Sequence, residues 1–327
     1  MASLFNRASY PHRHWRNPGP LGIAGEEFVS TSDQFLELET LPRRIVLIGG
    51  GYIAAEFSHL AAPAGARVTI LQRDARMFPH FDEALVGWLM SSFHELGIVV
   101  HTGLTADSIS QTDDGLTVRA TYSDGKEIDV VADLVIHVAG RVPELASLDL
   151  AAGDVAVANG RLRLTNGLQS VSNPRVYAAG DAAGVGPSLT PVSSHDAKVV
   201  TANMLDGVNA QPDYRGVPSV VFTVPPIATV GLSESDAQAK GLRVKVNAAS
   251  VPEWFTARRL NEAVYGYKVI IEEVTGVILG AHIVGPSADE VINLFALAIR
   301  NSLTAGALRD TMFAYPTAAS DVGYMLA

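Results

Sequence analysis

A glycine-rich turn is the feature that most constrains how this chain folds. The apolar run at 45–48 is typical of a buried parallel strand, the glycines at 49–51 follow it directly, and residues 54–57 favour a helix. That helix ends near Gly65, and a second apolar run at 68–71 comes next. A strand, a turn, a helix and a strand in such quick succession form one parallel crossover unit, so the sequence predicts an α/β domain here.

The turn itself has the pattern Gly49-x-Gly51-x-x-Ala54. In this pattern Gly49 permits the tight turn, Gly51 lets the backbone approach a pyrophosphate, and Ala54 allows the helix to pack closely on the strand. Free amides and the dipole at the start of the helix favour phosphate groups. The pattern therefore predicts a dinucleotide site. The alternative is a packing turn that binds no ligand.

The end of the second strand indicates which nucleotide fits. An NAD-selective site carries an acid there for the ribose hydroxyls, whereas this chain has Gln72 and Arg73. The planar guanidinium of Arg73 matches a 2′-phosphate, and Arg76 can reinforce it. We therefore expect NADP in preference to NAD. The alternative is that both arginines are ordinary solvated side chains.

The rest of the chain first continues this alternation and then changes character. A helix is predicted at 81–96, and strands are predicted at 98–101, 117–122, 127–131, 134–138 and 176–179, with Asp124 and Gly125 forming a hairpin turn. After Pro212 the pattern becomes antiparallel, with strands at 220–223, 268–272 and 277–284 and a helix at 288–302. We place domain boundaries near 142 and 215, after a disordered leader at 1–19.

Composition argues against several classes of function. The 327 residues carry a formal net charge of −10, unlike the basic footprint of a nucleic-acid binder. No apolar run is long enough for a membrane span, and a cytoplasmic location is the default expectation. The absence of cysteine excludes disulfides and dithiol chemistry carried by this chain.

The histidines and a triad-like stretch predict no competing site. His12 and His14 have no acidic or thiol partner nearby, so we expect no metal site. His195 and His282 lie on segments that read as packed, which favours structural roles. The stretch 193–196 (SSHD) is not a catalytic triad, because adjacent side chains cannot converge on one another.

Several motifs occur in an order that is typical of one family. They are 49–56 (GGGYIAAE), 140–143 (GRVP), 176–183 (VYAAGDAA), 189–192 (LTPV), 222–232 (FTVPPIATVGL) and 280–285 (GAHIVG). From about Pro20 to the C-terminus, the chain resembles the FAD- and NAD(P)-dependent pyridine nucleotide-disulfide oxidoreductases, such as glutathione reductase, dihydrolipoamide dehydrogenase and mercuric reductase.

The resemblance implies an α/β fold in three parts and two cofactors, FAD and NADP (or NAD). The parts are a Rossmann-like nucleotide-binding domain at 20–142, the C-terminal part of a flavin domain at 143–214, and an α+β dimerisation domain at 215–327. It also implies a homodimer formed through the last domain.

On the nicotinamide side, the resemblance assigns roles to residues of the first helix. Tyr52 resembles the aromatic lid that covers the flavin face until nicotinamide displaces it, and Ile53 follows it in the nucleotide-binding turn. Glu56 resembles the acid that pairs, in the family, with a lysine from a segment not found here. Gly140 resembles a glycine that comes close to the nucleotide. The alternative for Glu56 is an ordinary exposed helix glutamate.

On the flavin side, the resemblance assigns roles to three residues. Gly180 and Asp181 resemble the pair at which the aspartate binds the ribityl chain, and the amides of a following helix meet the flavin phosphates. Thr190 resembles a residue near the isoalloxazine ring. The alternative for Asp181 is a helix N-cap.

Two departures from the family pattern bear on function. Relatives begin with a glycine-rich flavin segment and a redox-active cysteine pair, and nothing before 45 resembles either. Near the end, Tyr315 stands at the position of the family's catalytic histidine, with Ser320 at that of its acid and Asp321 beside it. A tyrosine of ordinary acidity is a poor proton relay near neutral pH.

These features predict an oxidoreductase that moves hydride from NADPH to FAD without a redox-active disulfide in this chain. The alternative is a dimerising nucleotide-binding protein from a truncated reading frame, either non-catalytic or one part of a split enzyme whose flavin segment comes from a separate chain. We expect the chain alone to hold FAD weakly or not at all, because half of the flavin cavity would belong to that segment.

Overall fold

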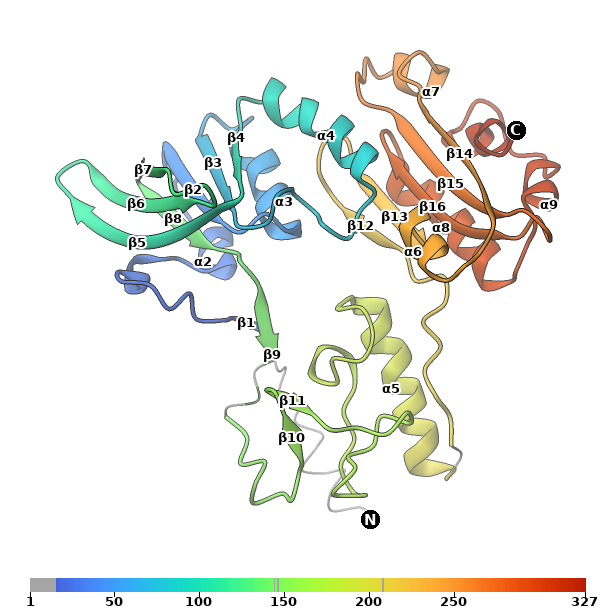
Figure 1. Cartoon of the computed structure of the whole chain (residues 1–327), viewed down its shortest axis with the longest axis horizontal. Coiled ribbons are helices and arrows are strands. Elements are labelled where there is room, and N and C mark those ends of the chain that lie inside the picture. The colour runs from blue at the N-terminus through green and yellow to red at the C-terminus, as the bar shows by residue number, and fades with distance from the viewer. Residues whose placement is uncertain (1–15, 144, 146, 208) are drawn as a thin grey trace. The chain divides into compact units, whose positions relative to one another are not determined.

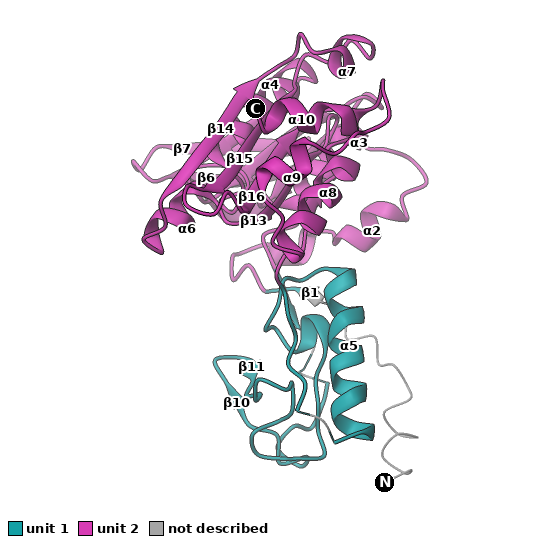
Figure 2. Ribbon diagram, turned by 90° about the vertical axis from the view of Figure 1, so that its right-hand side faces the viewer, with its two compact units in different colours: residues 1–19, 141–214 teal, residues 20–140, 215–327 magenta. Residues whose placement is uncertain are grey.

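The computed structural model describes residues 16–143, 145, 147–207 and 209–327 (Figure 1). The chain forms two compact units (Figure 2): unit 1 comprises 1–19 and 141–214, and unit 2 comprises 20–140 and 215–327. Most of the predicted leader lies outside the described residues. Its end forms strand β1 (Arg16–Pro18), which pairs antiparallel with β9 (Arg141–Pro143) in unit 1.

A four-stranded parallel sheet in the order β4-β3-β2-β8 is the centre of the first half of unit 2. The strands and helices predicted from the apolar runs are present, and their ends agree within a few residues. Their bounds are β2 (Arg44–Ile48), α3 (Tyr52–Ala61), β3 (Arg67–Gln72), α4 (Glu83–Glu95), β4 (Val99–Thr102) and β8 (Leu134–His137), preceded by η1 (Glu26–Phe28) and α2 (Ser32–Leu36).

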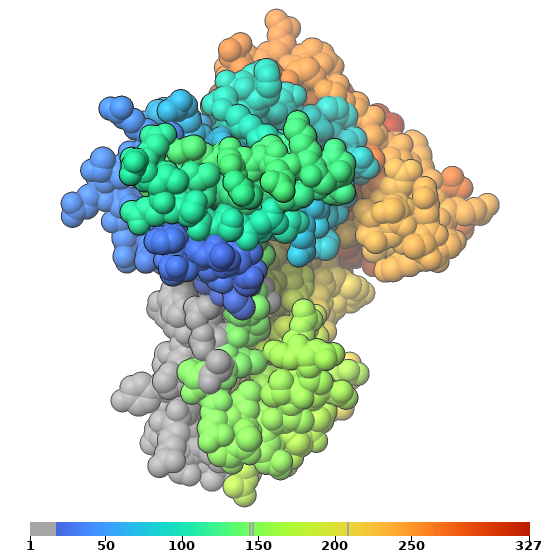
Figure 3. Space-filling view, turned by 60° about the vertical axis from the view of Figure 1, so that its left-hand side comes forward, coloured from blue at the N-terminus to red at the C-terminus, as the bar shows by residue number. Residues whose placement is uncertain are grey.

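Both faces of this sheet are covered, which explains why its strands are continuous apolar runs. Alternate side chains point to opposite faces. Ile45 and Leu47 pack with helices α3 and α4, while Val46 and Ile48 pack with a three-stranded antiparallel sheet on the other side. That second sheet, whose residues lie on the face shown in Figure 3, consists of β5 (Leu104–Thr112), β6 (Gly115–Tyr122) and β7 (Glu127–Ala132).

The C-terminal part of unit 2 is an α+β structure, as predicted. Its five strands are antiparallel in the order β12-β13-β16-β15-β14, and α8 packs on the sheet through Val291, Ile292 and Phe295. The bounds are β12 (Ser219–Val221), β13 (Ile227–Gly231), α6 (Glu234–Ala239), β14 (Val244–Ser250), α7 (Phe255–Arg258), β15 (Gly266–Glu272), β16 (Ile278–Val284), α8 (Ala288–Arg300), α9 (Ala305–Arg309), η3 (Ala318–Asp321) and α10 (Val322–Met325).

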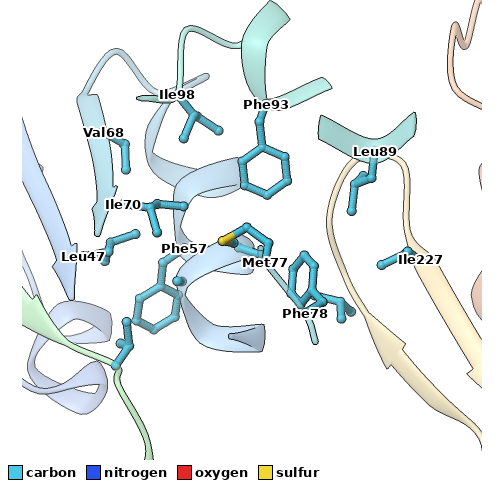
Figure 4. Close-up of a cluster of buried hydrophobic side chains, with 14 of the residues drawn as sticks. Leu47, Phe57, Val68, Ile70, Met77, Phe78, Leu89, Phe93, Ile98 and Ile227 are labelled. Atoms are coloured by element: carbon cyan, nitrogen blue, oxygen red, sulfur yellow. The ribbon is translucent and has the colours of Figure 1, made fainter. Parts of the chain in front are cut away.

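The two halves of unit 2 share one hydrophobic core. Leu89 on α4 lies opposite Ile227 on β13, and both belong to the same buried cluster as Leu47 and Ile70 of the parallel sheet (Figure 4). Helix α4 therefore packs against both sheets, and segments far apart in the sequence stabilise each other.

Unit 1 differs from the sequence prediction at 176–179. These residues are half-exposed, and in the described part of the chain they form one isolated β-bridge, between Tyr177 and Gln169. The prediction of a buried strand here is therefore wrong. A buried strand needs partners on both edges, and an apolar run alone does not provide them. The other elements of unit 1 are β10 (Val157–Ala158), β11 (Arg161–Leu162), η2 (Gly180–Ala182) and α5 (Thr190–Leu205).

Candidate nucleotide and flavin sites

The turn after β2 has the geometry that its glycines predict. Gly49 has φ = 116°, and a Cβ added there would lie 2.6 Å from the carbonyl carbon of Val138 and the amide nitrogen of Ala139. Its own amide donates to the carbonyl oxygen of Leu71 at 2.8 Å. The end of β2 is thus fixed between the ends of β8 and β3, and a residue with a side chain does not fit at Gly49.

The space above the turn is open. At Gly51, the N-cap of α3, and at Gly140, no atom of the described residues lies within 4 Å of an added Cβ. The amides of Tyr52, Ile53 and Ala54 are at the helix N-terminus, where backbone donors have no intrahelical acceptor. This end of the helix can accept a phosphate group, with the fully buried Ala54 side chain packed beneath it.

Gln72, at the end of β3, holds the turn and the following loop together. Its Oε1 accepts the amide of Gly50 at 2.9 Å, and its Nε2 donates to Asp74 Oδ2 at 3.1 Å and to the carbonyl oxygen of Arg76 at 3.3 Å. The side chain is buried. From the sequence, Gln72 was noted only because it stands where an NAD-selective site has an acid. Its hydrogen bonds to backbone groups could not be predicted, because the sequence pattern does not show which backbone groups lie near a side-chain amide.

The two candidate arginines occupy different environments. Arg73 is exposed, immediately after β3. Arg76 donates from Nη1 to the carbonyl oxygens of Phe78 at 3.3 Å and Phe81 at 3.0 Å, and from Nη2 to that of Pro79 at 2.7 Å. Arg73 is therefore open to a ligand, while most of the Arg76 guanidinium is already bonded to its own loop.

Tyr52 lies at the first position of α3 and retains 37% exposure. Its ring centroid is 5.7 Å from that of Phe81 and 6.5 Å from that of Phe78, both in edge arrangements. Burial raises the pKa of the Tyr52 phenol, a side-chain hydrogen bond with Ser219 partly offsets this, and the nearby Glu56 carboxylate adds a smaller upward effect. Tyr52 and Glu56 are one helical turn apart, so they share a face of α3.

The Glu56 carboxylate connects α3 to the segment after β12. Its Oε1 accepts the amide of Phe222 at 3.1 Å, and the residue is half-buried. Glu56 is therefore not an ordinary exposed helix glutamate. Phe222 itself is 63% exposed beside it.

In unit 1, Gly180 is held in place by a buried aspartate. The Gly180 amide donates to Asp196 Oδ2 at 2.9 Å, and the Tyr214 hydroxyl donates to Asp196 Oδ1 at 2.8 Å. Gly180 has φ = 60°, and an added Cβ would lie 2.8 Å from the Cβ of Ser193. Burial and the Asp196 carboxylate raise the pKa of Tyr214. Asp196 is fully buried and organises this turn, a role that the sequence did not indicate.

Asp181 and Thr190 lie on neighbouring elements of the same unit. Asp181 is half-exposed within the short helix η2, so it is not an N-cap. Thr190 is exposed at the start of α5, one turn before Ser193, which faces Gly180. The short helix η2 contains Asp181 itself, and the next helix along the chain is α5.

Tyr315 is 76% exposed in this chain, with its ring 6.5 Å from that of Phe255. The two candidate partners at the family's acid position have other bonds. Ser320 Oγ donates to the carbonyl oxygen of Thr317 at 2.6 Å, and the buried Asp321 accepts the Tyr265 hydroxyl at 2.9 Å. Burial and Asp321 together raise the pKa of Tyr265.

The side chains of His195 and His282 make hydrogen bonds within the protein. His282 is buried, and its ring nitrogens lie 2.6 Å from Thr229 Oγ1 and 3.2 Å from the carbonyl oxygen of Leu232. His195 Nε2 accepts the amide of Asp213 at 3.0 Å. His12 and His14 fall outside the described residues. In the part of the chain that is described, no group of three or more histidine, aspartate or glutamate residues is arranged to hold a metal. Of the described helices, none is both long and apolar enough to cross a membrane.

The parallel sheet with its glycine turn is typical of a dinucleotide-binding domain, and it is followed here by an antiparallel sheet with a packed helix. The chain belongs to the pyridine nucleotide-disulphide oxidoreductase family. The model of that family matches residues 14–197, and the model of its dimerisation domain matches 217–325. These matches confirm the resemblance and the fold class read from the sequence.

Individual relatives agree with this assignment. A mercuric reductase of Staphylococcus aureus is 35% identical over 88% of this chain and 52% of its own length. An uncharacterized 19.7 kDa protein in a mercuric resistance operon of the same species is 50% identical over 49% of this chain and 89% of its own length. The chain spans about half the length of the mercuric reductases that it matches.

Among solved structures, the chain is similar to the HOCl-induced flavoprotein disulfide reductase RclA from Escherichia coli. The TM-score is 0.88 at 25% sequence identity, and the match covers 96% of this chain and 72% of RclA.

Proposed function

We propose that this chain is an oxidoreductase that takes a hydride from NADPH and passes it to FAD, without a redox-active cysteine pair of its own. The observation that carries the proposal is the turn at 49–51. Gly49 is fixed against the backbone that follows β8, while Gly51 and the N-terminus of α3 face open space. This open space at a helix N-terminus leaves room for a pyrophosphate.

Each part of the chain has a distinct task in this proposal. Gly51 and the first amides of α3 bind the pyrophosphate, and Arg73 binds the 2′-phosphate. Tyr52 and Glu56 lie toward the nicotinamide end, where Glu56 is held by the Phe222 amide. When both cofactors are bound, the nicotinamide supplies the hydride and the flavin accepts it.

The flavin part of the proposal rests on residues of unit 1. Asp181 would bind the ribityl chain, and Thr190 would lie at the ring. Gly180 supports them, because Asp196 fixes its amide and Ser193 leaves no room for a side chain. Tyr315 would take the place of the family's histidine, and its exposure makes it available to a second copy of the chain. We also infer a homodimer through 215–327 and a cytoplasmic location.

Nucleotide titration tests the cofactor preference. We expect NADPH to bind more tightly than NADH, and Arg73→Ala to remove the difference. A charge-assisted hydrogen bond is worth about 1.5–3 kcal/mol, or roughly ten- to a hundredfold in affinity. Arg43→Ala is the matched control, because Arg43 is another exposed arginine and lies at the opposite end of the parallel strands. Equal affinities of the wild type for NADPH and NADH would contradict the preference.

A second candidate function is favoured by the half-exposed segment at 176–179. The segment forms a single β-bridge among the described residues and is not part of a sheet, so strands of another chain could complete the flavin cavity beside it. In that case the protein alone is a dimerising nucleotide-binding subunit. The visible spectrum after gel filtration with added FAD distinguishes the two. A stoichiometric flavin band supports the first function, and its absence supports the second.

A further inference from the structure

The side chain of Arg76 makes three hydrogen bonds within the loop between β3 and α4. The guanidinium of Arg76 donates to the carbonyl oxygens of Phe78, Pro79 and Phe81, and so closes the loop on itself. Phe78 is 3% exposed and has φ = 48°, a left-handed conformation that is unusual for a bulky residue. Such a conformation persists only where the surroundings determine it, and Arg76 is a large part of those surroundings.

The same two phenylalanines flank Tyr52. Phe78 and Phe81 are edge-on to each other at 5.7 Å, and each is edge-on to Tyr52, so the three rings form a mutually packed set. Both phenylalanines are almost completely buried, whereas Tyr52 is 37% exposed. The buried pair, together with the hydrogen bond between Tyr52 and Ser219, therefore limits where the exposed ring can lie.

The loop is also connected to the nucleotide-binding turn. The Phe78 amide donates to the carbonyl oxygen of Gly50 at 3.4 Å, and Gln72 bonds both the Gly50 amide and the carbonyl oxygen of Arg76. If the loop moved, the turn and Tyr52, the first residue of α3, would therefore move with it.

We propose that Arg76 is a positioning residue that holds Tyr52 through Phe78 and Phe81, and that it does not bind the nucleotide phosphate. This replaces the phosphate-binding role that the sequence suggested for Arg76 and leaves that role to Arg73 alone. The inference rests on the proposed function where it places Tyr52 at the nicotinamide end. The contacts among the three rings and the arginine do not depend on it.

Fluorine NMR of the full chain containing 3-fluorotyrosine tests the proposal. Nine tyrosines give nine signals, and the Tyr52 signal is the one lost in Tyr52→Phe. Without nucleotide, we expect Arg76→Gln to shift or broaden this signal and the matched variant Arg73→Gln to leave it in place. Phe81→Leu removes one flanking ring directly, so it should also move the signal, and it carries the test if Arg76→Gln does not fold.

Nucleotide affinities provide the second readout. Arg76→Gln should keep the NADPH-to-NADH affinity ratio within about twofold of the wild type, whereas Arg73→Gln should lower it about tenfold or more. The proposal is overturned if the Tyr52 signal is unmoved in Arg76→Gln or in Phe81→Leu, or if Arg76→Gln lowers the affinity ratio as Arg73→Gln does. If the wild type binds neither nucleotide, the proposed function fails, and the fluorine signals still decide the role of Arg76.

Discussion

Replacing Gly49 by alanine should damage the fold before it affects any ligand. The new Cβ would lie 2.6 Å from backbone atoms of Val138 and Ala139, which cannot move without disturbing the end of β8. The backbone at Gly49, with φ = 116°, is also strained for any other residue. Strain of this kind costs about 1–3 kcal/mol, and the overlap adds to it, so we expect a loss of about 3 kcal/mol or more in the free energy of unfolding.

Gly51→Ala is the matched control, only two residues away. Gly51 has φ = −94°, and no described atom lies within 4 Å of its added Cβ. Alanine at an N-cap costs about 1 kcal/mol or less relative to glycine, so stability should change little. The methyl group would instead occupy the open space above the turn, and nucleotide affinity should fall.

Thermal unfolding and nucleotide titration measure the two effects. At about 2–4 °C per kcal/mol for a chain of this size, Gly49→Ala should lower Tm by roughly 6–12 °C. Gly51→Ala should lower it by a few degrees at most and should weaken NADPH binding. A Tm for Gly49→Ala close to that of the wild type would refute the reasoning, as would a Gly51→Ala variant that binds NADPH with unchanged affinity.

Three other predictions concern stability and assembly. Burial lowers the pKa of His59 and of His282 below the unfolded value of about 6.5, so their contribution to the free energy of unfolding is fully present above that pH and is lost as pH falls below it. Thermal melts between pH 8 and 5 should show a falling Tm, and His59→Asn should make this fall smaller. Asp321→Ala leaves the buried Tyr265 hydroxyl without its acceptor and should cost about 1–3 kcal/mol in denaturant unfolding, with less effect in a Tyr265→Phe background. Light scattering at micromolar concentration should give twice the mass of one chain, and a monomer would count against the inferred homodimer.

The sequence predicted the parallel sheet well because its strands carry their own signal. A strand that is buried on both faces is a continuous apolar run, and the glycine after β2 marks where the run must end. The patterns do not predict β5, where polar residues outnumber apolar ones, because only alternate positions of that strand face the core. At 176–179 an apolar run is present without the neighbouring strands that would bury it.

The site was predicted less completely, because its supporting contacts are to backbone groups. Arg76 bonds three carbonyl oxygens, and Gln72 bonds an amide of the turn; the letters of the sequence do not show such partners. From the sequence, Asp196 was set aside together with its neighbours, and no role was predicted for it. Its actual role depends on a helix that brings it to the Gly180 amide, which spacing alone does not reveal.

The core shared by α4 and the antiparallel sheet has a consequence for synthesis of the protein. The parallel sheet and its helices leave the ribosome first, but the face of α4 at Leu89 is completed only when Ile227 and Val284 have emerged. Until then the nascent chain presents an uncovered apolar surface, the kind of surface that chaperones bind. A gene that stops after 214 would therefore encode a parallel sheet whose helix α4 keeps this apolar surface uncovered.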